Sequence, residues 1–200
     1  MTKKFDIKEA IAQYETVFDK LNERYFENEL KRPIITIQMD AKKSAYGWCT
    51  NYQAWKADEE DEGHYEINLC AEHLNRSTTD ICSTLFHEMI HLKNCQDGII
   101  DCTAGQYHNK KFKDTAEKYG LIVEKTNRGY SKTRMDDEQI AFCKTLKLTE
   151  YKIKRDTPSK KKTSKKGYKY QCPICGSSFW STKELHVHCE DCDEDFEVVN

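Results

Sequence analysis

The sequence predicts an α+β fold, in which helices pack on a small antiparallel sheet and a small cysteine-rich module follows. Three observations predict it. Apolar residues recur at helical spacing near the N-terminus, and short β-branched segments and a second amphipathic helix come after them. Four cysteines then fall within the last 29 residues as two C-x-x-C pairs. A chain of 200 residues is long enough for one medium domain and such an appendage.

The composition describes a soluble, intracellular protein. The formal net charge is −2, so the overall charge indicates no particular partner. No apolar stretch approaches the roughly 20 residues that span a bilayer, and the opening "MTKKFDIKEA" lacks the apolar segment of a signal peptide. In a reducing cytosol, ten cysteines indicate metal ligands and buried thiols rather than disulfides.

The first elements switch from helical to strand periodicity. A helix is expected over residues 6–27, because apolar side chains there are three or four positions apart: Ile7, Ile11, Tyr14, Phe18, Leu21 and Tyr25. Strands are expected at Ile34–Met39, in "SAYGWCT", and at Tyr65–Leu69. The acidic run "DEEDE" (Asp58–Glu62) lies between the last two, where a hairpin would hold it in water.

Three further helices are predicted. The second helix contains "LFHEMIHLKN" (Leu85–Asn94), and Ser77, Thr78 or Thr79 can cap its N-terminus. The third spans His108–Tyr119 and stops before Gly120, a residue type that favours the position after a helix. The fourth spans about 136–147.

A change in composition divides the chain into a domain (1–150), a flexible basic linker (151–167) and a C-terminal module (168–200). From Lys152 to Lys169 there are nine Lys or Arg residues and one Asp. From Glu184 onward the chain carries seven carboxylates and no Lys or Arg. Such charge blocks are typical of solvated linkers and tails, and the basic block also contains Ser and Thr.

The stretch "LFHEMIHLKN" carries an H-E-x-x-H pattern. Each helical residue advances about 100°, so with His87 at zero, His91 lies at about 40° and Glu88 at about 100°. The apolar residues fill an arc from about 120° to 260°: Ile81, Cys82, Leu85, Phe86, Met89 and Leu92. Both imidazoles therefore point together, away from the apolar arc, as two zinc ligands on one helix must.

The chemistry of zinc hydrolases explains these residue types. Neutral imidazoles leave the metal its full charge, which lowers the pKa of bound water to about 7. Glu88 is offset enough to miss the metal and to reach that water, take its proton and pass it to a leaving amine. The same pattern also occurs in buried helices with two satisfied histidines, so a third ligand decides between the two interpretations.

The third ligand must come from outside this helix. A metzincin requires glycine and histidine at positions 94 and 97, and the sequence has Asn94 and Asp97, which excludes that class. A glutamate from a second helix would be Glu117, but His108 is better placed because it opens the third helix inside "QYHNKKF". Two other histidines are expected at the surface: His64 and His73.

Together, "RYFENELKRPIITIQ", "LFHEMIHLKN" and "HNKKF" resemble the SprT-like zinc metalloprotease family, which includes bacterial SprT and Spartan-like proteins. The resemblance covers about residues 5–150. It implies a zincin-like minimal metalloprotease domain, with a catalytic zinc held by His87, His91 and His108 and with Glu88 as the general base. Tyr130 is a weak candidate for oxyanion stabilisation, and a structural role suits it better.

The resemblance also implies a function. We expect a zinc-dependent metallopeptidase that hydrolyses peptide bonds, on proteins associated with DNA, as in the repair of DNA–protein crosslinks. The alternative is a DNA-associated or regulatory protein that keeps the zinc-binding fold without proteolysis. The intact Glu88 argues against that alternative, because binding alone needs no base. We expect a monomer in the cytoplasm, where association with the nucleoid is compatible with the resemblance.

The C-terminal cysteines predict a second, structural zinc site. Cys172, Cys175, Cys189 and Cys192 form C-x2-C pairs separated by thirteen residues, a spacing typical of a closed four-thiolate site. A module this small has too little core to fold alone, so the metal would stabilise it. The segments "ELHVH" and "FEVV" suggest strands, which favours a zinc ribbon, as in many bacterial SprT proteins. In the competing β-β-α finger, His188 would replace Cys189.

DNA, single-stranded or damaged, is the expected partner of the linker and the ribbon, besides protein substrates. Lysines of the linker could contact phosphates, and four aromatic residues could stack on bases: Tyr168, Tyr170, Phe179 and Trp180. The acidic tail would repel DNA. The remaining cysteines are interpreted as core or incidental thiols: Cys49, Cys70, Cys82, Cys95, Cys102 and Cys143.

Overall fold

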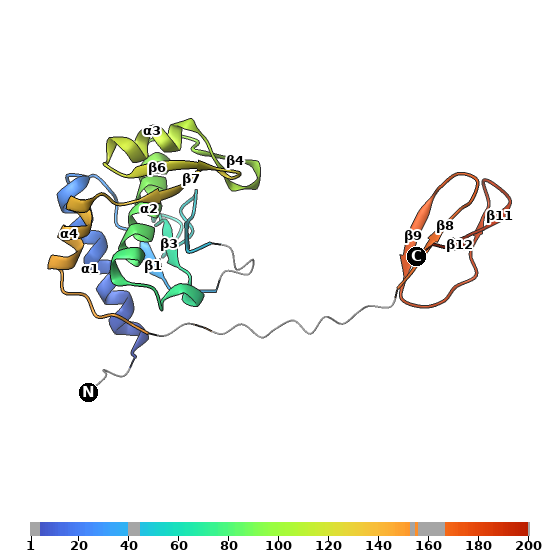
Figure 1. Cartoon of the computed structure of the whole chain (residues 1–200), viewed down its shortest axis with the longest axis horizontal. Helices are drawn as coiled ribbons and strands as arrows, with labels where there is room; N and C mark the ends of the chain where they lie inside the picture. The colour runs from blue at the N-terminus through green and yellow to red at the C-terminus, as the bar shows by residue number, and fades with distance from the viewer. Residues whose placement is uncertain (1–4, 40–44, 153–154, 156–166, 200) are drawn as a thin grey trace. The chain divides into compact units, whose positions relative to one another are not determined.

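The structure is a computed structural model that describes residues 5–39, 45–152, 155 and 167–199. The chain divides into two compact units, Met1–Thr157 and Pro158–Asn200 (Figure 1). Most of the predicted basic linker (151–167) lies outside the described residues. The predicted boundaries of the domain, linker and ribbon therefore stay a prediction.

Helix α1 (Ile7–Tyr25) begins at Asp6, whose side chain accepts a hydrogen bond from the Lys8 backbone N–H at 2.8 Å. Its buried stripe differs from the predicted one at the N-terminal end, where Ile7 is exposed. The stripe is formed by Ala10, Tyr14, Val17, Phe18 and Leu21. These side chains contribute to one continuous core that also contains the apolar face of the second helix.

The first sheet has three strands in the order β1-β3-β2: β1 (Ile34–Thr36), β2 (Gly47–Cys49) and β3 (Glu66–Leu69). β2 pairs antiparallel with β3, but β1 pairs parallel with it, so the predicted all-antiparallel sheet is wrong. The reason is the order in which the chain forms the three strands. The chain passes from β1 to β2 and returns to β3 between them, so only the β2–β3 pair is a hairpin.

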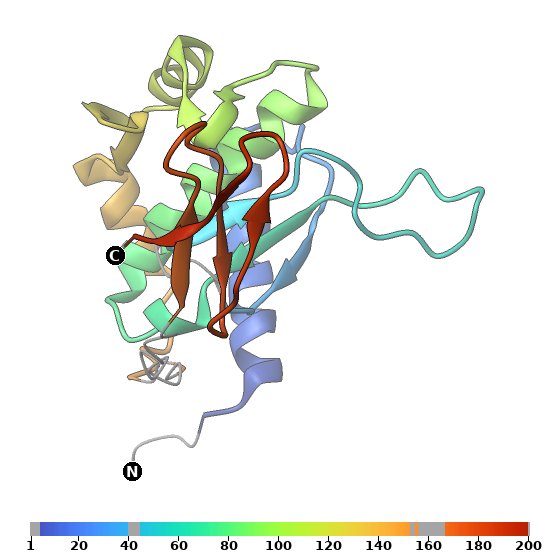
Figure 2. The ribbon, with the colours of Figure 1, turned by 90° about the vertical axis from the view of Figure 1, so that its right-hand side faces the viewer.

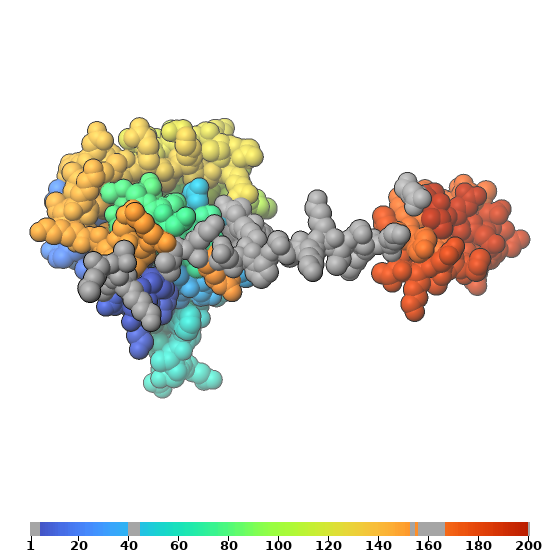
Figure 3. Space-filling model, turned by 60° about the horizontal axis from the view of Figure 1, so that its bottom comes forward, coloured from blue at the N-terminus to red at the C-terminus, as the bar shows by residue number. Residues whose placement is uncertain are grey.

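The loop between β2 and β3 carries the acidic run. It is closed by an isolated antiparallel bridge between Trp55 and His64, and Figures 2 and 3 show it projecting from the surface of its unit. Residues 51–60 are exposed, as expected for a surface loop that leads into the acidic run. The short helix η1 (Ala71–His73) follows β3.

Helix α2 (Thr78–Gln96) runs through the middle of the unit (Figure 1). Ser77 is its N-cap and accepts the Asp80 backbone N–H at 3.1 Å. The predicted apolar arc is buried, with Leu85, Phe86 and Met89 fully inaccessible. Since this arc faces the core, the opposite side of the helix is left for the polar residues.

The segment after α2 differs from the prediction. His108 does not open a helix: it lies in strand β5 (Tyr107–His108), and α3 spans Lys110–Lys118 with Asn109 as its N-cap. Asn109 takes that place because its side chain accepts the backbone N–H of Lys111 at 2.8 Å. Helix α4 (Asp137–Thr145) starts with a capping box formed by Asp136 and Gln139.

A second sheet, which the sequence analysis did not predict, has the order β4-β5-β7-β6. Its strands are β4 (Cys102–Thr103), β5, β6 (Ile122–Thr126) and β7 (Gly129–Arg134), and η2 (Ala104–Gln106) connects β4 to β5. Gly129 has a φ of 75°, and a Cβ there would overlap the His108 carbonyl. Glycine is therefore needed where β7 approaches β5.

The C-terminal unit is a small β module. One sheet has the order β12-β8-β9, from β8 (Tyr168–Gln171), β9 (Ser178–Ser181) and β12 (Glu197–Val198). A second pairs β10 (His188–Cys189) with β11 (Glu194–Asp195). The stretch "FEVV" thus supplies a strand, but "ELHVH" is irregular except at His188, so that strand prediction is largely wrong.

The secondary structure of residues 167–199 bears on the choice of metal site. Residues 167–199 contain strands and turns only, which disfavours the β-β-α finger. The interior is small, with Tyr170 stacked on Phe179 at 5.0 Å and Phe196 in an edge-on contact with Phe179 at 5.2 Å. Along the described parts of both units, no helix is long and apolar enough to cross a membrane.

Candidate metal centre

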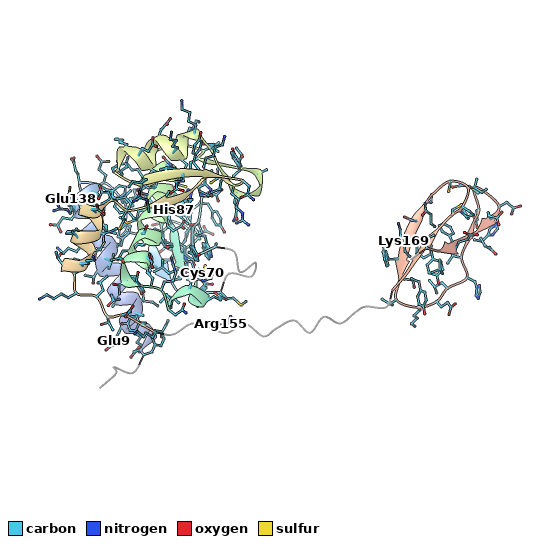
Figure 4. The ribbon with its side chains drawn as sticks, in the orientation of Figure 1. Glu9, Cys70, His87, Glu138, Arg155 and Lys169 are labelled. Atoms are coloured by element: carbon cyan, nitrogen blue, oxygen red, sulfur yellow. The ribbon has the colours of Figure 1, made fainter. Side chains whose placement is uncertain are left out.

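Three histidine rings meet beside α2. His87 (labelled in Figure 4) and His91 project from the same side of α2, and His108 comes from β5. Their Nε2 atoms form a nearly equilateral triangle with separations of 3.2 Å (87–108), 3.2 Å (87–91) and 3.1 Å (91–108). The structure therefore brings together the two histidines of the helix and the third one that the sequence favoured.

This triangle fits a tetrahedral zinc ion. Zn–N bonds of about 2.05 Å at tetrahedral angles place ligand nitrogens about 3.3 Å apart, close to the separations found here. The donor set, three imidazole nitrogens, is also the one that zinc prefers in hydrolytic sites. The residues present therefore fit the metal that the H-E-x-x-H pattern implies.

Each ring is fixed through its other nitrogen. Nδ1 of His87 lies 2.8 Å from Thr133 Oγ1, Nδ1 of His91 lies 2.7 Å from Asp101 Oδ2, and Nδ1 of His108 lies 3.1 Å from the Gln106 carbonyl. With Nδ1–H donating to oxygen, Nε2 is left with its lone pair toward the centre. These oxygens therefore select the tautomer that binds a metal.

Asp101 belongs to a longer network that the sequence analysis missed. The Asn94 side-chain amide donates to its Oδ2 at 2.9 Å, and Thr115 Oγ1 donates to Asn94 Oδ1 at 2.7 Å. Asn94 is completely buried. The one available signal was its position three residues after His91, on the same helical face. Asn94, the residue that excludes a metzincin, thus orients the Asp101 carboxylate that contacts His91.

The electrostatics of the rings match this arrangement. Burial, with the neighbouring His91 and His108, lowers the pKa of His87 well below its usual value. Burial and His91 lower the pKa of His108 to about 4. Burial disfavours the charged form of His91, but its hydrogen bond to Asp101 and the negative charges of Glu88 and Asp101 together outweigh that effect and raise its pKa.

Glu88 lies beside the three rings but does not join them. Within the described residues, the cluster of metal-ligand atoms contains the histidines and not this carboxylate. Glu88 is buried, and burial raises its pKa to about 7, although His91 and a hydrogen bond from the Cys49 backbone N–H oppose the rise. A carboxylate with such a pKa can both accept and release a proton near neutral pH.

The rings open into a cleft of about 1010 Å³. Its floor is α2, one wall is β2 and the other is β7. β2 lies very close to Glu88 because position 47 is glycine: a Cβ there would lie 2.8 Å from the Asn68 carbonyl oxygen and 3.3 Å from Glu88 Cγ. The absence of a side chain at Gly47 therefore lets the edge strand β2 come close enough for the Cys49 N–H to donate to the Glu88 carboxylate.

The other predicted residues lie elsewhere. His64 is exposed in the acidic hairpin, His73 stacks edge-on against Tyr46, and Glu117 is on the exposed side of α3 near Lys113. The ring of Tyr130 contacts the ammonium groups of Lys113 and Lys125 and does not line the cleft. Three of the thiols taken as core or incidental do line it: Cys49, Cys95 and Cys102.

The four C-terminal cysteines form a second cluster, with their sulfur atoms within 4.8 Å of one another. Cys175 Sγ lies 3.9 Å from Cys189 Sγ, close to the roughly 3.8 Å between thiolates around a tetrahedral zinc. Hydrogen bonds with Ser177 lower the pKa of Cys175 to about 6. This cluster has the composition of a closed structural site.

His188 is not part of that cluster. Its ring is half-exposed, with Nδ1 2.9 Å from Asp195 and Nε2 3.3 Å from Asp193. Both ring nitrogens are thus engaged by carboxylates. The geometry favours the four-cysteine set over the set in which His188 replaces Cys189.

The aromatic residues considered for base stacking are divided. Tyr170 is buried and stacks on Phe179, whereas Trp180 is 71% exposed and both Tyr168 and Phe179 are partly exposed. Trp180 is therefore the most accessible of the four to a ligand. The side chains of the linker lysines from Lys160 to Lys166 lie outside the described residues.

Comparison with known proteins identifies the family. The family model described as SprT-like matches residues 14–134, a segment that contains α2 and all three clustered histidines. Neither the search of curated proteins nor the search of solved structures gave a match. Since the family match covers more than half of the 200 residues, this chain belongs to the SprT-like family, a metallopeptidase-like family.

Proposed function

We propose that the chain is a zinc-dependent endopeptidase of SprT type, whose N-terminal unit has a zincin-like minimal fold. The observation that carries the proposal is the triangle of Nε2 atoms from His87, His91 and His108 with the buried Glu88 carboxylate beside it. Three neutral ligands, an accessible cleft and an adjacent base are the parts of a hydrolytic zinc site.

Zinc bound by the three rings would supply Lewis acidity and an activated water at neutral pH. Glu88 is the proton carrier: its carboxylate accepts the proton of the attacking water and delivers it to the leaving nitrogen. The Cys49 N–H holds this carboxylate in place. Thr133 and Asp101 keep the rings of His87 and His91 in the ligating orientation.

The edge strand β2 supports an extended peptide as the substrate. The Tyr46 carbonyl accepts from Cys70 N–H, and Thr50 N–H donates to the Glu66 carbonyl, so both face β3. The alternate residues Gly47 and Cys49 turn their backbone groups the other way, toward the cleft. Except for the Cys49 N–H, these groups are available to pair with a peptide lying along β2.

For the C-terminal unit we propose a structural zinc bound by Cys172, Cys175, Cys189 and Cys192. We further propose that the substrates are proteins associated with DNA. The support is the lysine-rich sequence from Lys152 to Lys169 and the exposed ring of Trp180, which could add phosphate contacts and stacking. A cytoplasmic protein that acts near the nucleoid is consistent with this role.

The variant Glu88→Gln tests the proposal. Gln is isosteric but cannot accept the proton, so proteolysis should fall at least about a hundredfold while the zinc content stays that of the wild type. Cleavage of an unfolded protein and of a DNA-bound protein should be measured with and without single-stranded DNA. Cleavage that survives the change contradicts the mechanism. DNA binding without cleavage by the wild type would select the non-proteolytic alternative.

A further inference from the structure

The two walls of the cleft differ in charge. The β2 wall presents Tyr46, Gly47 and Trp48, which are uncharged. The opposite wall, from the β6–β7 turn along β7, presents Arg128, Lys132 and Arg134, and all three side chains are exposed. In Figure 1, β7 crosses beside α2, the helix that carries His87 and His91. The cations therefore flank the reacting centre on one side.

The acidic residues of the cleft do not balance these cations. Glu88 and Asp101 are buried and engaged with the metal centre. The negative charge of Asp80 is offset by the positive charge of Arg76. The Arg76 guanidinium lies 3.0 Å from Thr84 Oγ1 and 4.1 Å from the centroid of the Tyr46 ring. The floor and the β2 wall are thus close to neutral.

Glu124 is the acidic neighbour of the β7 cations. It forms an ion pair with Lys132 at 2.6 Å, and Arg134 contributes to lowering the pKa of its carboxyl. Along the described segments, no ion pair joins Arg128 or Arg134 to a carboxylate. Lys132 is thus paired with Glu124, whereas the charges of Arg128 and Arg134 are not offset by an ion pair within the described residues, so the β7 wall has an excess of positive charge.

The position of β7 directs this charge at a bound peptide. From Ser131 to Arg134, β7 pairs with β6 on one side, and its pairing with β5 is limited to Gly129. Its other edge therefore faces the cleft, opposite β2. A peptide extended along β2 would direct alternate side chains toward α2 and toward solvent. The side chains on the solvent side would lie next to β7 and its cations.

We propose that the cleft selects peptide segments with acidic side chains close to the scissile bond, and that Arg128 and Arg134 are the residues that determine this preference. The inference rests on the proposed peptidase function and specifies its substrate class. Each contact is an exposed charge pair, which changes affinity on the order of two- to fivefold, and salt screens it. The β2 wall supplies backbone pairing, and the β7 wall supplies the selection by charge.

The test uses three fluorescent peptides of equal length that differ only at the two positions on either side of a fixed core, as Glu, Gln or Lys. Binding is measured by anisotropy on the zinc-loaded, full-length Glu88→Gln protein, and cleavage on the protein with Glu88 intact. We expect the Glu peptide to bind several-fold tighter than the Gln peptide and the Lys peptide to bind weakest. Raising the salt concentration should reduce the differences.

The double change Arg128→Glu with Arg134→Glu should reverse this order, so that the Lys peptide binds best. The matched control, Lys8→Glu with Lys144→Glu, makes the same change in net charge at exposed positions of α1 and α4 that do not line the cleft. It should keep the original order. Zinc content and circular dichroism establish that each variant is folded.

Three outcomes would overturn the inference. One is the same order of peptides in the double variant and in the parent protein. Another is the absence of binding by all three peptides. The third is a loss of single-stranded oligonucleotide binding in the double variant without a change in peptide preference, which would make the β7 wall a nucleic-acid site. Persistence of cleavage in Glu88→Gln would instead refute the proposed function, so the two failures are distinguishable.

Discussion

The histidine centre of the N-terminal unit and the cysteine cluster of the C-terminal unit both fit zinc, but they are built in opposite ways. The first has three ligands from two separate elements and opens into a cleft of about 1010 Å³. The second has four ligands from two turns of a small module. An ion with three protein ligands keeps a position for chemistry, whereas four thiolates close the site.

The residues around the two clusters also differ. The histidine rings are oriented by Thr133, Asp101 and the Gln106 carbonyl, on a unit with a large core of its own. The cysteines belong to a unit whose aromatic interior is formed by Tyr170, Phe179 and Phe196. The N-terminal unit would therefore fold without metal and bind zinc for reaction, whereas the C-terminal unit would need zinc in order to fold.

Breaking the cysteine cluster should have the largest structural effect. The double change Cys172→Ser with Cys175→Ser removes half of the ligands, and structural zinc in small domains contributes about 10–16 kcal/mol of binding energy that is coupled to folding. The C-terminal unit should lose its dispersed NMR signals and become protease-sensitive. The N-terminal unit should keep its melting temperature and its metal. A C-terminal unit that stays folded would contradict the structural role.

The second prediction sharpens the histidine side of the comparison. Asp101→Asn keeps the shape of the side chain but removes the charge that orients His91. Loss of such a partner weakens metal binding about 10- to 100-fold. Competition with a chelator should show this weakening for the N-terminal zinc, with the C-terminal zinc unchanged. Equal loss from both sites would mean that the change acts through general unfolding.

The third prediction concerns the smallest effect. His188→Ala should leave the C-terminal metal in place, because that ring contacts Asp193 and Asp195 and not the sulfur cluster. The melting temperature of the C-terminal unit should hardly change, because exposed ion pairs contribute little to stability. Cobalt substitution supplies the readout, since the spectrum of a four-thiolate site should not change. A shift in that spectrum would restore the ligand set with His188.

Local periodicity accounts for what could be predicted about the site. The apolar arc of α2 is sufficient to place His87 and His91 on one face and Glu88 at its edge. The sequence favours His108 as the third ligand, but the prediction that it opens a helix is wrong. A strand of two residues such as β5 has no periodicity to detect. Asp101 and Thr133 reach the rings through contacts between distant segments, which spacing alone does not encode.

The second sheet could have been found. Asn127, Arg128 and Gly129 form a turn signal between two segments that contain strand-forming residues, but charged side chains in both segments weaken the strand pattern. The parallel pairing of β1 with β3 is different in kind. It depends on which strand takes the middle of the sheet, and burial of both faces of β3 decides that only in three dimensions.

The most direct test of the account is a count of zinc ions per chain by native mass spectrometry for the wild type, His108→Ala and the control His64→Ala. Two zinc ions are expected in the wild type and in the control. In His108→Ala, one zinc ion and the proteolytic activity should be lost, while the C-terminal unit stays folded. A His108→Ala protein that retains both ions and still cleaves its substrate would contradict the proposed centre.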